Sequence, residues 1–168
     1  MQVVCYVLAT ADVDAVQMVP CFSHAFSKQL AAFSHRMEMC RQALADFDPA
    51  RARVSDVEGV LSGTSRTIDT VRHLRGENPD TEYSLVVGTD IFPERHDWKE
   101  FEALERLCQF VVIGRRGYPT PKGHDIAPPL VDVSSTQIRE GLASGVAPGK
   151  LVSRRVAQYI QAHGLYRS

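Results

Sequence analysis

The chain has 168 residues, which suits one domain with one ordinary hydrophobic core. It is 44% hydrophobic and 23% charged, close to the globular average, so the composition argues against disorder. The net charge of −1 offers no basic excess for binding nucleic acid or an anionic membrane. No apolar run approaches the roughly 20 residues that span a bilayer, and the first ten residues do not resemble a signal peptide. We therefore expect a single cytoplasmic domain over residues 1–168.

Short valine-rich runs alternate with amphipathic stretches along the chain. The runs are typical of strands buried on both faces of a parallel sheet and cover residues 15–20, 83–88, 110–114 and 130–133, with a weaker, alternating strand at 52–58. The amphipathic stretches predict helices over residues 33–47, 65–77, 98–107 and 153–164. Strands that alternate with helices in this way predict an α/β fold with a parallel sheet.

The four cysteines are Cys5, Cys21, Cys40 and Cys108. No two of them have C-x-x-C spacing, and each lies in or beside an apolar stretch. This pattern predicts reduced, mostly buried thiols in preference to a zinc site or a disulfide framework.

Polar groups suited to binding follow four of the predicted strands. These groups are His24 and Lys28, then Thr89 and Asp90, then Arg115 and Arg116, and finally Ser134, Ser135, Thr136 and Arg139. Ligands of open α/β sheets bind beyond the carboxyl ends of the strands. Because three of the four groups are cationic, the pattern predicts a site for an anionic ligand.

The segment "VDVSSTQIREGL" (131–142) predicts a helix that starts at Ser134. Ser134 is a good N-cap, and Gln137 completes an S-x-x-Q capping box. One reading is purely structural, with Arg139 paired locally. The other is a phosphate cradle, because free N–H groups at a helix start, hydroxyls and an arginine fork together suit a polyphosphate.

This segment resembles the I-S-S-T-x-I-R motif of nucleotidyltransferases, and four further segments narrow the resemblance. "VSDVEGVLSGTSRTIDTVRHLR", "VVGTDIFPERHDWKEFEAL", "VVIGRRGYP" and "VAQYIQAHGLY" together resemble the bacterial nicotinate mononucleotide adenylyltransferases. The resemblance covers essentially the whole chain and implies a Rossmann-like parallel sheet. It also implies adenylyl transfer from ATP to nicotinate mononucleotide, with pyrophosphate as the second product.

The resemblance assigns a role to each motif. Ser134, Ser135, Thr136 and Arg139 would hold the ATP phosphates, with Ser135 and Arg139 also acting in catalysis, and Lys28 would reach a phosphate. The mononucleotide would be bound by Thr67, Gly88, Asp90, Trp98 and Arg115. Mg²⁺ would be carried mainly by phosphates and water, so no protein ligand cluster is required.

Simpler roles stay open for the same residues. Thr67 could support the start of its helix, Asp90 could cap a turn, and Trp98, the only tryptophan, could be core packing. Arg115 and Arg116 could be solvated loop charges, and His24 could be an exposed bystander. Arg66 stands where the resembled family usually has an aromatic residue.

One departure from the resembled family affects both folding and chemistry. That family begins with a strand, a G-x-F-x-P turn and a helix bearing H-x-G-H, and none of these is found here. In the 3-2-1-4-5 strand order the first strand is central, so its two neighbours would each lose a partner, at about 1–3 kcal/mol per buried unpaired group.

Three explanations of this departure are considered. The recorded start could be misplaced, which we favour, the sheet could close up around the gap, or a second copy could fill it in a homo-oligomer. We expect residues 1–168 alone to be inactive or nearly so. Two alternative functions stay open, namely a nucleotide-binding pseudoenzyme and an adenylyl- or cytidylyltransferase that acts on another phosphorylated acceptor.

Overall fold

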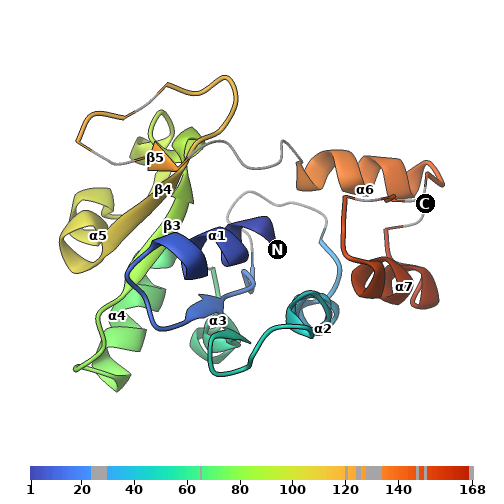
Figure 1. The fold of residues 1–168 in the computed structure, drawn as a ribbon, viewed down its shortest axis with the longest axis horizontal. Helices are drawn as coiled ribbons and strands as arrows, with labels where there is room; N and C mark the ends of the chain where they lie inside the picture. The colour runs from blue at the N-terminus through green and yellow to red at the C-terminus, as the bar shows by residue number, and fades with distance from the viewer. Residues whose placement is uncertain are drawn as a thin grey trace.

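The computed structural model describes residues 1–23, 30–64, 66–119, 121–123, 126–127, 134–146, 148–149 and 151–166. Parallel strands alternate with helices, so the predicted Rossmann-like α/β class is confirmed (Figure 1). The helices are α1 (Gln2–Thr10), α2 (Phe33–Leu44), α3 (Val57–Leu61), α4 (Thr67–Glu77), α5 (Phe101–Leu107), α6 (Ser135–Ala143) and α7 (Arg154–Ala162). Two short 3₁₀ helices, η1 (Thr89–Ile91) and η2 (Arg95–Asp97), follow β3.

The strands form two separate sheets in the described part of the chain. One pairs β1 (Val16–Met18) with β2 (Ala52–Val54), and the other has the order β3 (Ser84–Gly88), β4 (Gln109–Ile113) and β5 (Ile126–Ala127). Every pair is parallel. The predicted strand at 130–133 lies outside the described residues. The sheet therefore has not closed between β1 and β3, which contradicts the second of the three explanations.

The prediction of one strand over residues 52–58 is wrong in its second half. The β1–β2 ladder ends where Ser55 N–H donates to Met18 O, and α3 begins two residues later with the buried Val57. Val54 and Val57 are three residues apart, a spacing that suits a helix face, so the short apolar pattern did not identify the change. Apart from the strand at 130–133, which lies outside the described residues, the other predicted helices and strands are present with ends shifted by a few residues.

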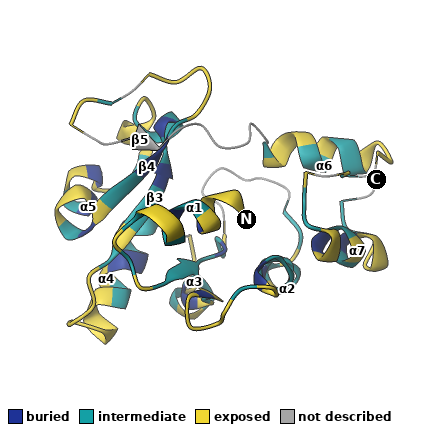
Figure 2. Cartoon of the chain, viewed as in Figure 1, coloured by how far each residue is buried: buried dark blue, intermediate teal, exposed yellow. Residues whose placement is uncertain are grey.

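The hydrophobic core is divided in the same way as the sheet. One buried cluster contains Ile68, Val71, Leu104 and Cys108 between α4, α5 and the β3–β4 sheet. The other contains Val4, Leu44 and Ala52 from α1, α2 and β2. Figure 2 shows buried residues on α4, α5 and β4, and separately on α2 and α7. A domain of this size usually has one contiguous core. Here the two buried clusters lie on either side of the break between the two sheets.

The C-terminal helix returns to the first half of the molecule. Helix α7 packs on α2, where Arg155 forms an ion pair with Asp46 at 3.0 Å and His35 Nδ1 lies 2.9 Å from the Tyr159 hydroxyl. In Figure 1, α7 consequently lies beside α2, with α6 above α7, and both lie away from the β3–β4 sheet. This arrangement fixes where the predicted phosphate cradle of α6 stands.

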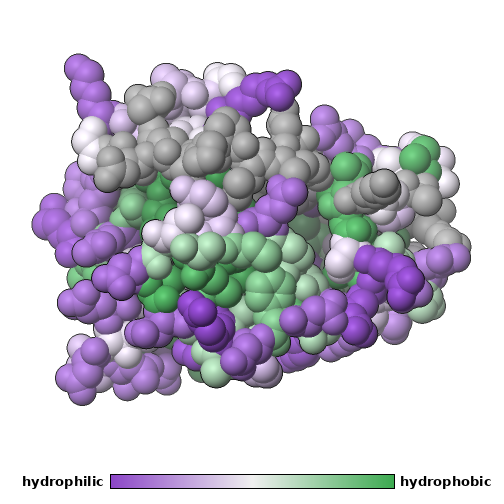
Figure 3. Space-filling view, viewed as in Figure 1, coloured by the Kyte–Doolittle hydropathy of each residue, from purple (hydrophilic) through white to green (hydrophobic). Residues whose placement is uncertain are grey.

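Helix α1 exposes apolar side chains as well as burying them. Val4 and Val7 are buried, whereas Val3 and Cys5 are exposed, and Figure 3 shows hydrophobic surface over this helix. The prediction of mostly buried thiols is therefore wrong for Cys5, which lies on the outer face of α1. All four cysteines are free, and burial raises the pKa of Cys40 and Cys108. No helix among the described residues is long and apolar enough to cross a bilayer.

Candidate nucleotide-binding site

The end of β3 brings Gly88, Thr89, Asp90 and Arg115 together. Arg115 Nε lies 3.5 Å from Asp90 Oδ1, and the Arg115 backbone N–H donates to Thr89 Oγ1 at 2.8 Å. Thr89 is only 1% exposed, so this hydrogen bond ties the ends of β3 and β4 from inside the molecule. Both Asp90 and Arg115 stay partly exposed and face outward from the carboxyl ends of the strands, where ligands of α/β sheets bind.

Gly88 allows this close approach. A Cβ atom at position 88 would run into Asp90 Oδ1 and would come within 3.1 Å of Arg115 Cγ and Nε. Any larger residue would therefore push the carboxylate and the guanidinium apart. The glycine is required by the space at the strand end, since its φ of −86° is open to all residues.

Thr67 and Trp98 are fixed by neighbouring elements. Thr67 is the first residue of α4, and Trp98 ends η2, packs against the α4–α5 core and makes an edge contact with Phe101 at 6.1 Å between ring centroids. The core-packing reading of Trp98 is therefore confirmed, and the residue stays partly exposed. Thr67 follows the N-cap residue Arg66, and its support of the helix start stays a prediction.

Two ion pairs join the residues that follow Trp98 to α4. Lys99 Nζ lies 2.9 Å from Asp69 Oδ1, and Arg72 donates to both carboxylate oxygens of Glu100 at 3.1 and 2.6 Å. The hydrogen bond from Arg72 holds the pKa of Glu100 below its ordinary value. Glu100 has a left-handed φ of 53°, a conformation that this bidentate contact helps to hold.

Helix α6 has the predicted capping box. Ser134 Oγ accepts from the Gln137 backbone N–H at 3.1 Å, and Gln137 Oε1 accepts from the Ser134 N–H at 3.3 Å. Arg139 folds back toward the start of the helix and donates to Thr136 Oγ1 at 3.2 Å. The local partner of Arg139 is thus a hydroxyl of the cradle. A cation and a hydroxyl lie together at the positive end of this helix dipole.

The Tyr166 hydroxyl hydrogen-bonds the Ala31 backbone, just before α2. Burial raises the pKa of this hydroxyl, and the positive charge of Arg139 opposes the shift. The charge of Arg139 on α6 therefore acts on a group that contacts residue 31. Residue 31 closes the segment that contains Lys28 and His24, both of which lie outside the described residues.

The backbone that leads into this segment is held on both sides. Arg36 donates to the Cys21, Phe22 and Ala31 carbonyls, the last two at 2.9 and 3.0 Å. Glu58 Oε2 accepts from the Phe22 N–H at 2.9 Å, and Glu58 Oε1 accepts from Thr70 on α4 at 3.4 Å.

The structure thus assembles the predicted residues in two groups. Gly88, Asp90 and Arg115 lie at the end of β3, and Ser134, Thr136 and Arg139 lie at the start of α6. Ser135 is an exposed first-turn residue of α6. The sequence reasoning missed Arg36 and expected Thr89 to bind a ligand, whereas both residues support the backbone through partners far along the chain.

No metal centre is formed by protein side chains within the described ranges, where no three His, Cys, Asp or Glu groups come together to hold an ion. Asp90 is the acidic residue in the strand-end group, and Arg115 already neutralises part of its charge. The donor set suits an ion brought by phosphate oxygens and water better than one held by the protein alone.

Comparison with known proteins identifies the class first. The cytidylyltransferase-like family matches residues 7–141, and the chain belongs to this family of nucleotidyltransferases. Within it, a probable nicotinate-nucleotide adenylyltransferase of Myxococcus xanthus is 41% identical over 161 residues, which are 96% of this chain and 83% of the relative. A protein of the same name from Anaeromyxobacter dehalogenans is 39% identical over 96% of this chain and 86% of its own length. The chain is thus a member of the nicotinate-nucleotide adenylyltransferase family.

A solved structure agrees on the fold. Nicotinic acid mononucleotide adenylyltransferase of Plasmodium falciparum, complexed with NaAD, superimposes with a TM-score of 0.81 at 18% identity. The match covers 98% of this chain and 88% of that protein. The two halves described above therefore stand in the arrangement of one nucleotidyltransferase fold.

Proposed function

We propose that the protein transfers the adenylyl group of ATP to nicotinate mononucleotide, giving nicotinate adenine dinucleotide and pyrophosphate. The observation that carries the proposal is the start of α6, where a complete capping box, the Thr136 hydroxyl and the Arg139 guanidinium converge. The relatives at 39–41% identity support the choice of acceptor. As a step of NAD synthesis from dissolved nucleotides, the reaction belongs in the cytoplasm.

The reaction requires no nucleophile from the protein. A phosphate oxygen of the mononucleotide attacks the α-phosphorus of ATP, a new P–O bond forms, and the bond to the β-phosphate bridging oxygen breaks as pyrophosphate leaves. The task of the protein is to align the two phosphates and neutralise developing charge. Arg139 and the free N–H groups at the start of α6 are suited to that charge, and Ser134, Ser135 and Thr136 supply donors for phosphate oxygens. Lys28 would add a further cation.

The strand-end group is assigned to the mononucleotide. Asp90 can accept hydrogen bonds from ribose hydroxyls, and Arg115 can donate to an acceptor phosphate or carboxylate. Trp98 offers a half-buried ring face, and Thr67 supplies a hydroxyl and an N–H at the start of α4. This assignment leaves α6 free for the triphosphate.

Mg²⁺ is expected to enter with ATP, neutralising phosphate charge. Asp90 is the carboxylate of the described site that could bind Mg²⁺ directly. The Arg115 guanidinium competes with the ion for the same Asp90 oxygen. The remaining ligands would be phosphate oxygens and water.

Nucleotide binding is the first test, because it does not require turnover. Loss of a hydrogen bond to a charged group costs about 1.5–3 kcal/mol, so Arg139→Gln should weaken MgATP binding roughly 10- to 150-fold. Arg139→Lys keeps the positive charge but loses the planar guanidinium, so its MgATP affinity should lie between those of the parent chain and Arg139→Gln. Arg154→Gln, on an exposed residue at the start of α7, is the matched control and should bind like the parent chain. Equal MgATP affinity in all four proteins would refute the cradle.

Turnover is the second test. Pyrophosphate release is measured with ATP, Mg²⁺ and nicotinate mononucleotide, with nicotinamide mononucleotide and other phosphorylated acceptors as alternatives. Tight nucleotide binding without pyrophosphate release with any of these acceptors would identify a binding protein in place of an enzyme.

A further inference from the structure

Glu58 joins two parts of the molecule through one carboxylate. Its Oε2 accepts from the backbone N–H of Phe22 at 2.9 Å, and its Oε1 accepts from the Thr70 hydroxyl at 3.4 Å. Phe22 belongs to the backbone that leaves β1, whereas Thr70 lies at the start of α4 and is only 6% exposed. A carboxylate can accept hydrogen bonds on both of its oxygens at once. The side chain of Glu58 therefore fixes the start of α4 relative to the end of β1.

Helix α3 holds Glu58 in a fixed place. The residue before it, Val57, is buried, and the residue after it, Gly59, lies close to the Phe33 ring of α2. A Cβ atom at position 59 would be 2.7 Å from Phe33 Cε1, so the glycine lets α3 approach α2 this closely. The Phe33 ring also meets the Phe22 ring edge-on, with 5.0 Å between the centroids. The same contacts with α2 thus hold Glu58 and its partner Phe22.

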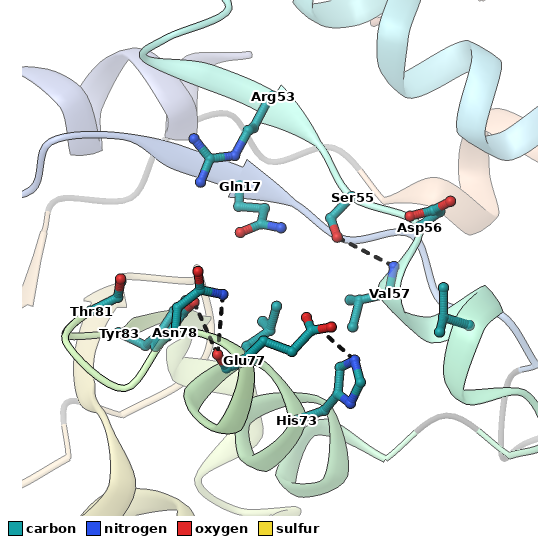
Figure 4. A pocket seen from close by; sticks show the side chains of 12 residues that line it. Gln17, Arg53, Ser55, Asp56, Val57, His73, Glu77, Asn78, Thr81 and Tyr83 are labelled. Atoms are coloured by element: carbon teal, nitrogen blue, oxygen red, sulfur yellow. Dashed lines mark hydrogen bonds and ion pairs between the residues drawn. The ribbon is translucent and has the colours of Figure 1, made fainter.

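Further along α4, the side chains that face β1 and β2 border a cavity of about 310 Å³. Gln17 and Arg53 line it from the strands, and His73 and Glu77 line it from α4, where they form the pair shown in Figure 4. At ~30 Å³ per water molecule, the cavity would hold roughly ten waters. Packing against α4 is therefore loose along the cavity, which leaves the position of the helix start to the contacts made by α3.

We infer that Glu58 is a positioning residue for the mononucleotide site, acting through the first turn of α4. Thr67 lies three residues before Thr70, so both stand in that turn. The proposed function assigns the Thr67 hydroxyl and N–H to the mononucleotide, and the inference rests on that assignment. A turn that is already fixed loses less conformational freedom when a ligand binds, and the ligand then binds more tightly. Glu58 has this effect without touching the ligand.

The geometry requires a hydrogen-bonding group at position 58 but no negative charge. In Glu58→Gln, the amide oxygen can accept from the Phe22 N–H, and the amide nitrogen can donate to Thr70 Oγ1. The Thr70 hydroxyl would then donate to Arg66 O, which already lies 3.4 Å away. Glutamine should therefore take the place of glutamate, whereas Glu58→Ala removes both bonds.

The test measures the binding of nicotinate mononucleotide and of MgATP in separate titrations. Glu58→Ala should raise the Kd for the mononucleotide about tenfold and leave the Kd for MgATP within about twofold of the parent. A merely structural role would weaken the binding of both ligands. Glu58→Gln should bind both ligands like the parent. Glu77→Ala is the matched control, because Glu77 lies at the other end of α4 with an exposed side chain, and it should also bind like the parent.

Thr70→Val tests the same bond from α4 and serves if Glu58→Ala does not fold. Valine has nearly the shape of threonine but cannot donate to Glu58, so the Kd for the mononucleotide should again rise severalfold. Because both changes remove one shared bond, the double variant should bind little worse than Glu58→Ala alone.

Two results would overturn the inference. One is equal mononucleotide affinity in the parent, Glu58→Ala and Thr70→Val. The other is a Glu58→Gln chain that binds as weakly as Glu58→Ala, because the charge would then be required. A parent chain that binds no mononucleotide would instead overturn the proposed function, and the inference with it.

Discussion

Replacing Thr89 by valine tests how the strand-end site is held. Thr89 is only 1% exposed, and its Oγ1 accepts a hydrogen bond from the backbone N–H of Arg115 at 2.8 Å. Valine has nearly the same shape, so the change removes the acceptor without leaving a cavity. A buried N–H without a partner costs about 1–3 kcal/mol. Against the 5–15 kcal/mol typical of a domain, Thr89→Val should lower the free energy of unfolding measurably.

The assay is urea unfolding, monitored through the fluorescence of Trp98, the only tryptophan in the sequence. Thr89→Ser is the matched control, because it keeps the hydroxyl and loses one methyl group, worth ~0.8 kcal/mol. Released from Thr89, Arg115 should also lose its fixed position, which would raise the Kd for the mononucleotide in a binding titration. Serine should restore the Kd. If valine matched the parent in both stability and Kd, or if serine were as damaging as valine, the reasoning would be refuted.

Three further changes should have separable effects. Gly88→Ala places a methyl group against Arg115, and this overpacking should cost about 1–3 kcal/mol. We expect weaker binding of the mononucleotide and unchanged affinity for MgATP, and titration of each ligand measures both. Ser134→Ala should cost about 1 kcal/mol of stability, whereas Ser134→Asp keeps an N-cap but repels phosphate, so only MgATP binding should fall. Because Arg72 holds the pKa of Glu100 below its ordinary 4.5, the stabilising contact is present at neutral pH and is lost as the pH falls through the lowered pKa. Glu100→Gln should therefore be less stable than the parent at neutral pH, and their urea midpoints should converge below pH 4.5; a constant difference would contradict this.

Local signals predicted most of the fold. Valine-rich runs located β1, β3 and β4, and apolar stripes located α2 and α4, because strand and helix periodicity depend only on neighbours in the chain. The capping box at Ser134 was predictable for the same reason, since both of its partners lie within three residues. The change from β2 to α3 was not, because a run of a few apolar residues suits both structures.

The supporting contacts of the site depend on tertiary structure. Thr89 meets its partner 26 residues along the chain, and Arg36 bonds three backbone carbonyls that leave no signature in the side-chain sequence. Exposure was also unpredictable for Cys5, because α1 is apolar on its outer face as well as its inner one. The sequence thus predicted which polar residues come together better than which residues hold them in place.

The divided core has a consequence for how the molecule loses its structure. The two buried clusters share no residue, so each half can open without exposing the core of the other, and the halves are expected to exchange their amide hydrogens as separate units.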